Sequence, residues 1–327
     1  MLYAGLDVHK NFCQAIVMTK DGELVKEDRI KSEKEDIEEF FSCLENVEVA
    51  FEASGNYEYY YDLLDSLGCK VYLSHPLKTR LIAEARIKTD KIDAKALADL
   101  LRGDLLPTSY VPPEKIRRLR HLVRHRIALG QHRTKLKNQI HAVLRRKNLK
   151  YNGQDTFSKD GIKWLRSLNN PEIDSYLAIY ETVMREIKSA DNEINREGIK
   201  DKEVKLLTTI PGIGIYSALL ILSEIGDIHR FKSEEKLFSY AGLIPRVHQS
   251  GETNYHGRIT KEGSKYLRWI LIEAVQVHIR YAPDSKITYH YYRIKKKRPG
   301  NVAKVAAARK LLQAIYHMLK NETEFRG

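Results

Sequence analysis

Along the first hundred residues, apolar side chains recur first at every second position and later at every third or fourth position. Leu2, Ala4, Leu6 and Val8 form the first alternation, and short β-rich runs follow it. Period two is typical of strands, and a spacing of three or four is typical of helices. The pattern predicts these elements in order: strands over 2–9, 12–18 and 23–30, a helix over 33–45, a strand over 47–53, a helix over 57–67, a strand over 70–74 and a helix from about residue 90.

After residue 106 the apolar spacing is mostly helical. Pro107, Pro112 and Pro113 separate the first unit from a long amphipathic helix that ends near residue 148. From Ile173 to Ile194 a second helix alternates steps of three and four residues, which is the spacing of a coiled-coil seam. This seam could pack on the first helix of the same chain or on another protomer, and the sequence favours neither.

The order of the elements predicts the fold class, α/β plus α. Three strands followed by alternating helix and strand is the order of an RNase H-like domain, which we expect over residues 1–106. A basic long helix with a coiled-coil region would follow over 107–202, and a mostly helical domain over 203–327.

The last domain opens with a turn that resembles a helix-hairpin-helix motif. LeuLeuThrThrIleProGlyIleGly at 206–214 precedes an apolar helix. Gly212 and Gly214 would let backbone N–H groups approach a phosphate at the helix N-terminus. Turns of this sequence also occur in ordinary loops that bind no phosphate, so both interpretations stay open.

Composition makes a polyanion the expected partner. The 327 residues are 43% hydrophobic, enough for real cores, and the formal net charge is +13. Residues 115–150 contain 13 Lys and Arg and no Asp or Glu, so this segment accounts for the whole excess. Such a run is usually a solvated helix face, but the missing acids favour a nucleic-acid backbone. The residues expected to contact phosphates are Arg117, Arg118, Arg120, Arg124, Lys135, Lys137, Arg145 and Arg146.

A second basic stretch, from Lys286 to Lys310, also contains no acid. Tyr289, Tyr291 and Tyr292 lie within it. They could stack on exposed bases or pack against a neighbouring helix, and the sequence alone does not separate these alternatives.

Neither membrane insertion nor secretion is expected. No apolar run approaches the roughly 20 residues of a membrane span. The N-terminal sequence lacks the charged and continuous apolar parts of a signal peptide. Cys13, Cys43 and Cys69 are odd in number and widely spaced, which indicates reduced thiols without metal-ligand spacing. We therefore expect a cytoplasmic protein without a membrane partner.

Four carboxylates occupy positions typical of a two-metal phosphodiester site. Asp7 lies in the first predicted strand, and Glu52 ends another strand just before Gly55. Asp90 and Asp93 begin a helix, where a spacing of three points both the same way. Hard oxygen ligands on rigid elements can hold two divalent ions about 3.5–4 Å apart, so that the attacking and leaving oxygens are both neutralised.

Each of these acids also has an ordinary explanation. Asp90 and Asp93 suit a helix N-terminus, and Glu52 could face solvent. Asp7 is harder to explain, because an acid between apolar strand residues costs stability unless it is paired or liganded.

Ser250 precedes Gly251 in a predicted loop and has several cations near it in the sequence. Those cations are Arg246, His248, Arg258 and Lys261. They could bind a scissile phosphate and stabilise the charge that develops on it. A serine before glycine is more often a turn residue or helix cap, so its role stays open at this point.

Six motifs together resemble the DEDD transposases of bridge-RNA-encoding insertion sequences, relatives of the Piv site-specific invertase. They are AspValHisLys at 7–10, GluAlaSerGly at 52–55, LysThrAspLysIleAspAla at 88–94, IleProGlyIleGly at 210–214, AlaGlyLeuIlePro at 241–245 with SerGly at 250–251, and AlaAlaAlaArgLysLeuLeu at 306–312. They occur in the family's order over nearly the whole chain. The resemblance implies a RuvC-like N-terminal domain, a coiled-coil insert and a C-terminal transposase domain.

The resemblance also implies the roles of the site residues. Asp7, Glu52, Asp90 and Asp93 would be the metal-binding tetrad, and Ser250 the nucleophile that becomes joined to DNA. The implied cofactor is a pair of Mg²⁺ ions, with Mn²⁺ as a substitute. The residue chemistry described above, and not the resemblance, makes Gly212, Gly214, Arg246, Arg258 and Lys261 the expected nucleic-acid contacts of this domain. We also expect a prokaryotic, nucleoid-associated protein.

The implied partners are double-stranded donor and target DNA and a structured non-coding guide (bridge) RNA. A homo-oligomer is implied too: a dimer that becomes a tetramer in the synaptic complex, where one protomer's metal site works with another's serine. Two other functions stay open. One is a structure-selective nuclease, such as a Holliday-junction resolvase, that uses water. The other is a binding scaffold without chemistry, which is disfavoured because clustered acids repel a polyanion unless metals lie between them.

Overall fold

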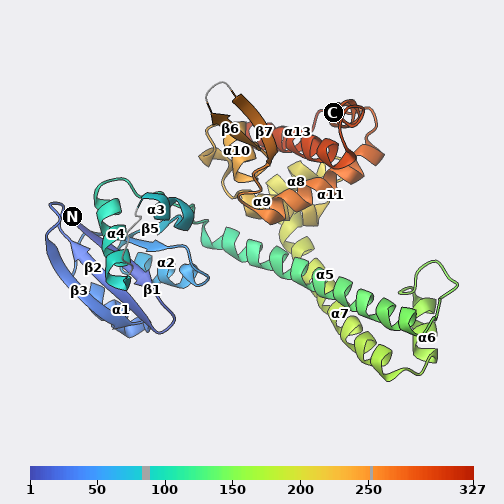
Figure 1. The fold of residues 1–327 in the computed structure, drawn as a ribbon, viewed down its shortest axis with the longest axis horizontal. Coiled ribbons are helices and arrows are strands. Elements are labelled where there is room, and N and C mark those ends of the chain that lie inside the picture. Colours follow the sequence, from blue (N-terminus) through green and yellow to red (C-terminus); the bar gives the residue numbers. More distant parts are fainter. Residues whose placement is uncertain (83–88, 251–252) are drawn as a thin grey trace. The chain divides into compact units, whose positions relative to one another are not determined.

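The protein folds into two compact units, which are described separately. The computed structural model describes residues 1–82, 89–250 and 253–327, with side chains at every described position except 247–250, 253–256 and 258. The first unit is Met1–Val111 and the second is Pro112–Gly327 (Figure 1). Within the described ranges, no helix is both long and apolar enough to cross a membrane.

The first unit is built on a five-stranded sheet with the order β3-β2-β1-β4-β5. Its strands are β1 (Leu2–Val8), β2 (Phe12–Met18), β3 (Leu24–Lys31), β4 (Val47–Glu52) and β5 (Lys70–Ser74) (Figure 1). β1, β2 and β3 form an antiparallel meander, whereas β4 and β5 run parallel to β1. Leu6 pairs with Phe51, so the carboxyl ends of the central strands β1 and β4 lie side by side.

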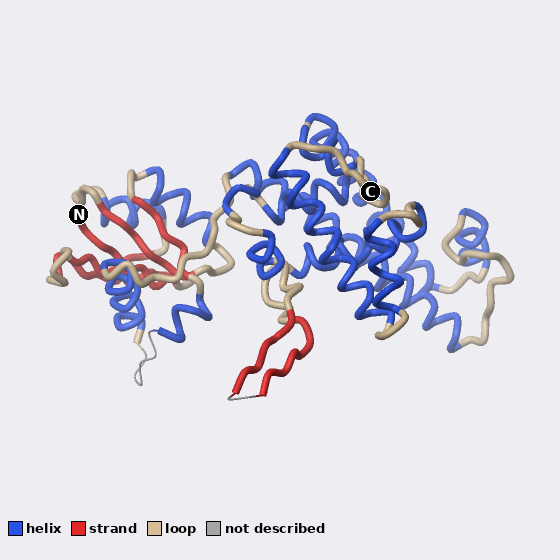
Figure 2. Tube along the Cα trace, turned by 90° about the horizontal axis from the view of Figure 1, so that it is seen from above, coloured by secondary structure: helices blue, strands red, loops and turns tan. Residues whose placement is uncertain are grey.

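Helices cover both faces of this sheet, as Figure 2 shows. They are α1 (Lys34–Phe41), α2 (Tyr57–Ser66), α3 (Pro76–Ile82) and α4 (Asp90–Arg102). α1 and α2 share a core with Leu6 and Phe51 on one face. On the opposite face, Leu97 of α4 packs with Ala50. The alternation along each strand therefore assigns successive residues to different layers.

The predicted mixed α/β order is confirmed, and the element boundaries differ by a few residues. The helix expected over 33–45 ends at Phe41. The sequence did not predict α3, because its Leu77 and Leu81 are exposed and give no amphipathic period. α3 is instead held by a hydrogen bond of 2.7 Å between the buried hydroxyls of Ser74 and Thr79.

The segment after α4 returns along the edge of the sheet. The amide of Ser109 donates to the carbonyl of Leu73 at 2.7 Å, and the amide of His75 donates to the carbonyl of Pro107 at 2.8 Å. Because these bonds continue past residue 106, the first compact unit extends to Val111.

The second unit begins with a long helical hairpin. Its helices are α5 (Glu114–Arg146), α6 (Lys159–Ser167) and α7 (Pro171–Lys200). α5 and α7 run antiparallel, and Ile173 and Tyr180 of α7 pack within the chain against Ile140 of α5 (Figure 1). Of the two arrangements left open for the α7 seam, packing on the basic helix of the same chain is therefore observed. A coiled coil with another protomer stays a prediction.

The remainder of the second unit is mostly helical. It contains α8 (Lys202–Thr208), α9 (Ile215–Ile225), the 3-10 helix Ile228–Arg230, α10 (Glu234–Tyr240), the hairpin β6 (Pro245–Ser250) and β7 (Thr253–Ile259), α11 (Lys265–Tyr281), α12 (Lys286–Lys295) and α13 (Gly300–Asn321). α9 is apolar on most sides and is buried in the main core. Leu119 and Val123 of α5 belong to the same core. The predicted division of this unit near residue 202 stays a prediction.

Gly5 marks the closest approach of β1 to α4. A Cβ at this position would lie 1.9 Å from the carbonyl oxygen of Ala94 and 2.8 Å from the amide nitrogen of Ala98. Both neighbours are backbone atoms of a helix, which cannot move aside independently. The absence of a side chain at Gly5 therefore fixes how near the first turn of α4 comes to the end of β1.

We expect Gly5→Ala to lower the free energy of unfolding by about 1–3 kcal/mol, which is the usual cost of overpacking a core. Differential scanning calorimetry of the full chain would show this as a lower melting temperature. Gly55→Ala is the matched control, because nothing lies within 4 Å of a Cβ placed there. Equal melting temperatures for the two variants would contradict the close packing of β1 on α4.

Candidate metal centre

Asp7 lies at the end of β1 on the face that α4 covers. Gly5 is two residues earlier and approaches the α4 backbone, so the strand alternation places Asp7 on the same side. The Asp7 side chain is 22% exposed. A carboxylate this sheltered needs a polar or charged partner.

Asp90 and Asp93 occupy the first turn of α4. The side-chain oxygen of Thr89 accepts a hydrogen bond from the amide of Ile92 at 3.3 Å, which caps the helix. Threonine is a favoured cap, and acids in the first turn complement the positive end of the helix dipole. The ordinary explanation for these acids thus holds, and the same turn brings Asp90 to the end of β1.

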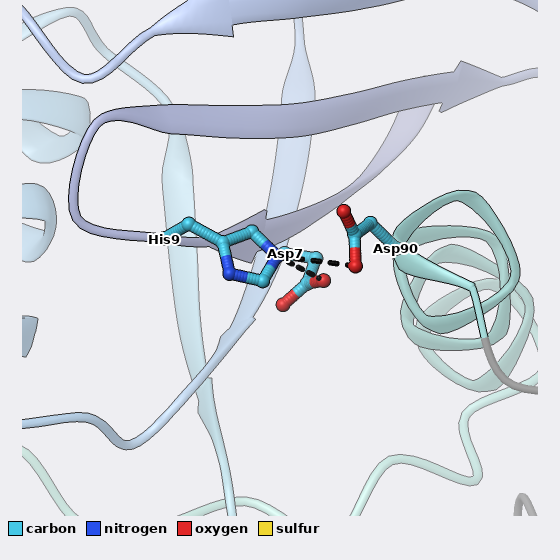
Figure 3. A group of neighbouring side chains, drawn as sticks. All are labelled: Asp7, His9 and Asp90. Carbon is cyan, nitrogen blue, oxygen red and sulfur yellow. Dashed lines mark hydrogen bonds and ion pairs between the residues drawn. The ribbon is translucent and has the colours of Figure 1, made fainter.

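His9 joins two of the acids, as Figure 3 shows. Its Nε2 lies 3.0 Å from Oδ2 of Asp7 and 3.3 Å from Oδ1 of Asp90. The ring stacks on Phe12 with 4.5 Å between centroids, which restrains its orientation. The sequence prediction assigned His9 no role. Its spacing of two residues from Asp7 was the signal that could have placed both on one side of the chain.

The surroundings of Asp7 disfavour its negative charge. Burial raises the pKa of Asp7 above its ordinary value, His9 opposes this shift, and the charges of Asp90 and Asp93 add to it. The carboxylate is therefore most stable when a positive charge lies beside it.

Glu52 ends β4 beside the same end of β1. Leu6 pairs with Phe51, and Asp7 and Glu52 are the residues that follow them in the two parallel strands. Because Ala50 packs on α4, strand alternation puts Glu52 on the α4 face as well. Its side chain is exposed.

The ligand atoms suit a divalent cation. Among the described residues, the group whose ligand atoms all lie within 4.8 Å of one another is Asp7, His9 and Asp90. Carboxylate oxygens are preferred by Mg²⁺ and Mn²⁺, and an imidazole nitrogen is compatible with Mn²⁺ and other transition metals. These three residues therefore fit a metal ion. Glu52 lies at the adjacent end of β4, and Asp93 lies in the first turn of α4.

Ser250 belongs to the second unit. It is the last residue of β6 and pairs with Thr253 of β7, so its backbone lies in a strand rather than in the predicted loop. The described side chains do not include Ser250, His248 or Arg258, and Gly251 lies outside the described residues. The nucleophilic role of Ser250 therefore stays a prediction.

The base of this hairpin is held by hydrogen bonds to backbone carbonyl groups. The amide of Thr260 donates to the carbonyl of Ile244 at 2.9 Å, and Nη1 of Arg268 donates to the carbonyl of Ala241 at 3.0 Å. Arg246 and Lys261 are exposed near this base. They are accessible to a ligand, but their contact with nucleic acid stays a prediction.

Several predicted phosphate contacts on α5 have partners inside the second unit. Arg124 forms two hydrogen bonds with the buried carboxylate of Glu224, at 2.7 and 3.0 Å. Arg120 donates to the carbonyl of Ser223 at 2.9 Å, and Arg117 is only 4% exposed. The acids missing from the sequence of α5 are thus supplied by other helices.

The other predicted α5 contacts are nearer the surface. Arg118 and Arg146 pair with Glu197 and Glu172 of α7 at 2.9 and 2.7 Å. Lys137 lies over the ring of Phe157 at 4.5 Å. Lys135 and Arg145 are exposed, and within the described part of the chain neither has a carboxylate in ion-pair range.

The two glycines of the predicted phosphate-binding turn differ in their surroundings. Gly212 has φ +95°, and a Cβ there would lie 2.8 Å from both the carbonyl oxygen of Ala274 and the amide nitrogen of His278. This glycine is needed for packing on α11. Gly214 caps α9, and a Cβ placed on it would have nothing within 4 Å, so the helix start is open there. Phosphate binding at the turn stays a prediction.

Replacing the Asp7 carboxylate should stabilise the metal-free protein. A raised pKa means that ionising Asp7 costs more in the folded than in the unfolded chain, so its contribution to stability is lost as pH rises. We expect Asp7→Asn to raise the melting temperature at pH 7 by roughly 1–3 °C. The difference should shrink as the pH falls toward 3.8, the ordinary pKa.

Thermal melts in a chelating buffer at several pH values measure this effect. Asp21→Asn is the control, because Asp21 is an exposed acid outside the centre. A less stable Asp7→Asn protein at pH 7 would contradict the unfavourable charge at this position.

Comparison with known proteins finds two matching family models. A family model described as a transposase matches residues 4–148, which include all four acids. A second model, described as the transposase of the IS116/IS110/IS902 family, matches residues 204–290, which include Ser250.

Individual relatives extend over most of the chain. A putative transposase of Sinorhizobium fredii, y4qE, is 28% identical over 76% of this chain and 62% of its own length. A probable family 20 transposase of Pseudomonas aeruginosa is 25% identical over 98% of both chains. The pilin gene-inverting protein of Moraxella bovis is 37% identical over 37% of this chain and 38% of its own. Together with the two family models, these similarities show that the chain belongs to the IS110 family of transposases.

Proposed function

We propose that this protein moves an insertion sequence by cutting and rejoining DNA strands through a covalent phosphoserine at Ser250, under the guidance of a structured RNA. The four acids would hold divalent ions beside the scissile phosphate. Membership of a transposase family supports the DNA-recombining part of the proposal.

The observation that carries the proposal is the contact of one imidazole nitrogen with two carboxylates. Nε2 of His9 lies within 3.3 Å of both Asp7 and Asp90, on elements separated by more than eighty residues of sequence. Carboxylates gathered at one point repel each other and repel DNA, unless a cation lies between them. The element order of the first unit, with acids on β1, β4 and α4, supports an RNase H-like, RuvC-like site.

The chain's own residues would act as follows. Asp7 and Asp90, with Glu52 and Asp93, would hold the ions, and His9 would orient the first two. When bound, Mg²⁺ would neutralise the attacking and leaving oxygens at phosphorus. Arg246 and Lys261, at the base of the hairpin that carries Ser250 at its other end, would contact the DNA backbone beside the reacting phosphate.

The transfer at Ser250 balances over two steps. In the first step, Oγ bonds to phosphorus, a bond from phosphorus to a deoxyribose oxygen breaks, the hydroxyl proton leaves Ser250 and the departing oxygen gains a proton. In the second step, a deoxyribose hydroxyl of another strand displaces Ser250, which recovers its hydroxyl. The number of phosphoester bonds is conserved, so rejoining needs no external energy source.

The proposed partners are duplex donor and target DNA, a guide RNA and further copies of this chain. Base pairing with the RNA would select the DNA sequence, while basic side chains would contribute affinity and salt dependence. Because the acids and Ser250 belong to different compact units, one protomer's acids could serve another's serine in a tetramer.

Covalent trapping tests the phosphoserine chemistry. The protein is incubated with Mg²⁺, the non-coding RNA flanking its gene, and labelled donor and target DNA, and is then run on denaturing gels. We expect a labelled protein–DNA adduct with the wild type, and roughly a 1,000-fold loss or more with Ser250→Ala or Asp7→Asn. Ser175→Ala and Asp21→Asn are matched controls at exposed positions and should form the adduct normally.

The other outcomes identify the rival functions. Cleaved DNA without an adduct, persisting in Ser250→Ala, would mean a nuclease that uses water. DNA binding without any cleavage, unchanged by Asp7→Asn, would mean a scaffold. An adduct that needs no RNA would contradict the guided part of the proposal.

Metal binding can be measured without activity. A ligand that binds the folded state stabilises it by about 2.7 kcal/mol at a hundred times its Kd. We expect saturating Mn²⁺ to raise the melting temperature of the wild type and of Asp21→Asn, and to have little effect on Asp7→Asn. An equal rise in all three proteins would contradict binding at this centre.

A further inference from the structure

The exposed face of α12 combines aromatic rings with positive charge. Tyr289 and Tyr292 are 70% and 50% exposed. Arg293 and Lys296 are exposed as well and follow each tyrosine by four residues, which puts all four on one side of the helix. We call these four residues the α12 face.

The opposite side of α12 packs against the core of the second unit. Ile287 and Tyr291 are buried in the main core of the second unit. The alternative that these tyrosines pack against a neighbouring helix therefore holds for Tyr291 alone. Tyr289 and Tyr292 remain available to a ligand.

The positive charge of the α12 face has no carboxylate partner among the described residues. Residues 285–321 contain ten Lys and Arg and no Asp or Glu. No described carboxylate lies in ion-pair range of Arg293 or Lys296. The pKa of His290 is lowered by burial and further by the positive charges of Arg293 and Lys310, which agrees with a positive potential.

The cations of α5 and those of the α12 face differ in their partners. On α5, arginines such as Arg124 and Arg126 are occupied by Glu224 and Asp191. The α12 face has the charge without such partners and adds two aromatic rings. Exposed rings stack on unpaired bases, whereas the bases of a duplex have their faces covered by their neighbours.

We infer that the α12 face binds an unpaired segment of RNA, with Tyr289 and Tyr292 stacking on bases and Arg293 and Lys296 contacting phosphates. The choice of RNA rests on the proposed function, in which the DNA partners are duplexes and the guide RNA is the partner with unpaired loops. The inference adds a surface and a single-strand preference to that function.

Fluorescence anisotropy of the full-length protein tests this inference in a chelating buffer, where no chemistry occurs. The probes are labelled oligouridylate, an RNA duplex, a DNA duplex and oligothymidylate of equal length. We expect the double variant Tyr289→Ala/Tyr292→Ala to bind oligouridylate roughly 10- to 100-fold more weakly. Binding of the two duplexes should change by less than about two-fold, since they offer no base faces to stack on.

Further variants separate the contribution of the positive charges to binding from that of the aromatic rings. Tyr289→Phe/Tyr292→Phe keeps the rings and should bind oligouridylate like the wild type. Arg293→Ala/Lys296→Ala should weaken binding and reduce the salt dependence by about 1.4 in the slope of log K against log salt, from about 0.7 per lost phosphate contact. Tyr59→Ala, at an exposed tyrosine of the first unit, is the control for removing a surface ring.

Three results would overturn the inference. Unchanged oligouridylate binding in the tyrosine double variant would remove the stacking role. Equal weakening on the RNA duplex would mean a general electrostatic or folding effect. Equal affinity and equal weakening with oligothymidylate would mean that the face binds single strands without selecting RNA. Loss of adduct formation with intact oligouridylate binding would count against the proposed function alone.

Discussion

The half-buried charge of Asp7 is the constraint on which the candidate site depends. Strand alternation turns Asp7 toward α4, and the absence of a side chain at Gly5 lets that helix lie close enough to bring Asp90 within reach. The same proximity makes the arrangement unfavourable without a cation, because burial and neighbouring acids both raise the pKa of Asp7. His9 supplies a hydrogen bond at this point, and a divalent ion would supply two charges. The charge of Asp7 thus lowers the stability of the metal-free chain, and a bound cation would offset this cost.

The positive charges of the second unit are of two kinds, those paired with carboxylates and those without such partners. On α5 much of the charge is structural: the bidentate pair of Arg124 with buried Glu224 ties the long helix to the core through α9. Removing one partner of such a pair leaves an uncompensated buried charge, which is strongly destabilising. On α12 the cations have no carboxylate partners among the described residues, so they remain available to an anionic ligand. Net charge predicts a polyanionic partner, but the fold determines which cations are exposed and unpaired and can therefore contact it.

Local patterns predicted most of the fold, and tertiary contacts decided the rest. The strands of the first unit were predictable because the first alternates and the others are short β-rich runs. Asp7 and Glu52 stood out at strand ends, and Asp90 and Asp93 at a helix start. α3 was missed because its apolar residues face outward. The partners of the α5 arginines could not be predicted, since Glu224 is about a hundred positions away. His9 was not predicted because the signal for it, a spacing of two residues from Asp7, is weak without knowledge that Asp90 lies beside both. Ser250 was expected in a loop, whereas β6 continues to this residue.

The most direct test of the metal centre is an anomalous difference map from crystals of the protein soaked in Mn²⁺. A peak is expected between Asp7 and Asp90, within coordination distance of a carboxylate oxygen of each, with Nε2 of His9 moved away from its shared contact or bound to the ion. A second peak toward Glu52 and Asp93 would complete a two-metal site. No peak, with His9 still bridging the two carboxylates at saturating Mn²⁺, would contradict a metal-dependent centre in the first unit.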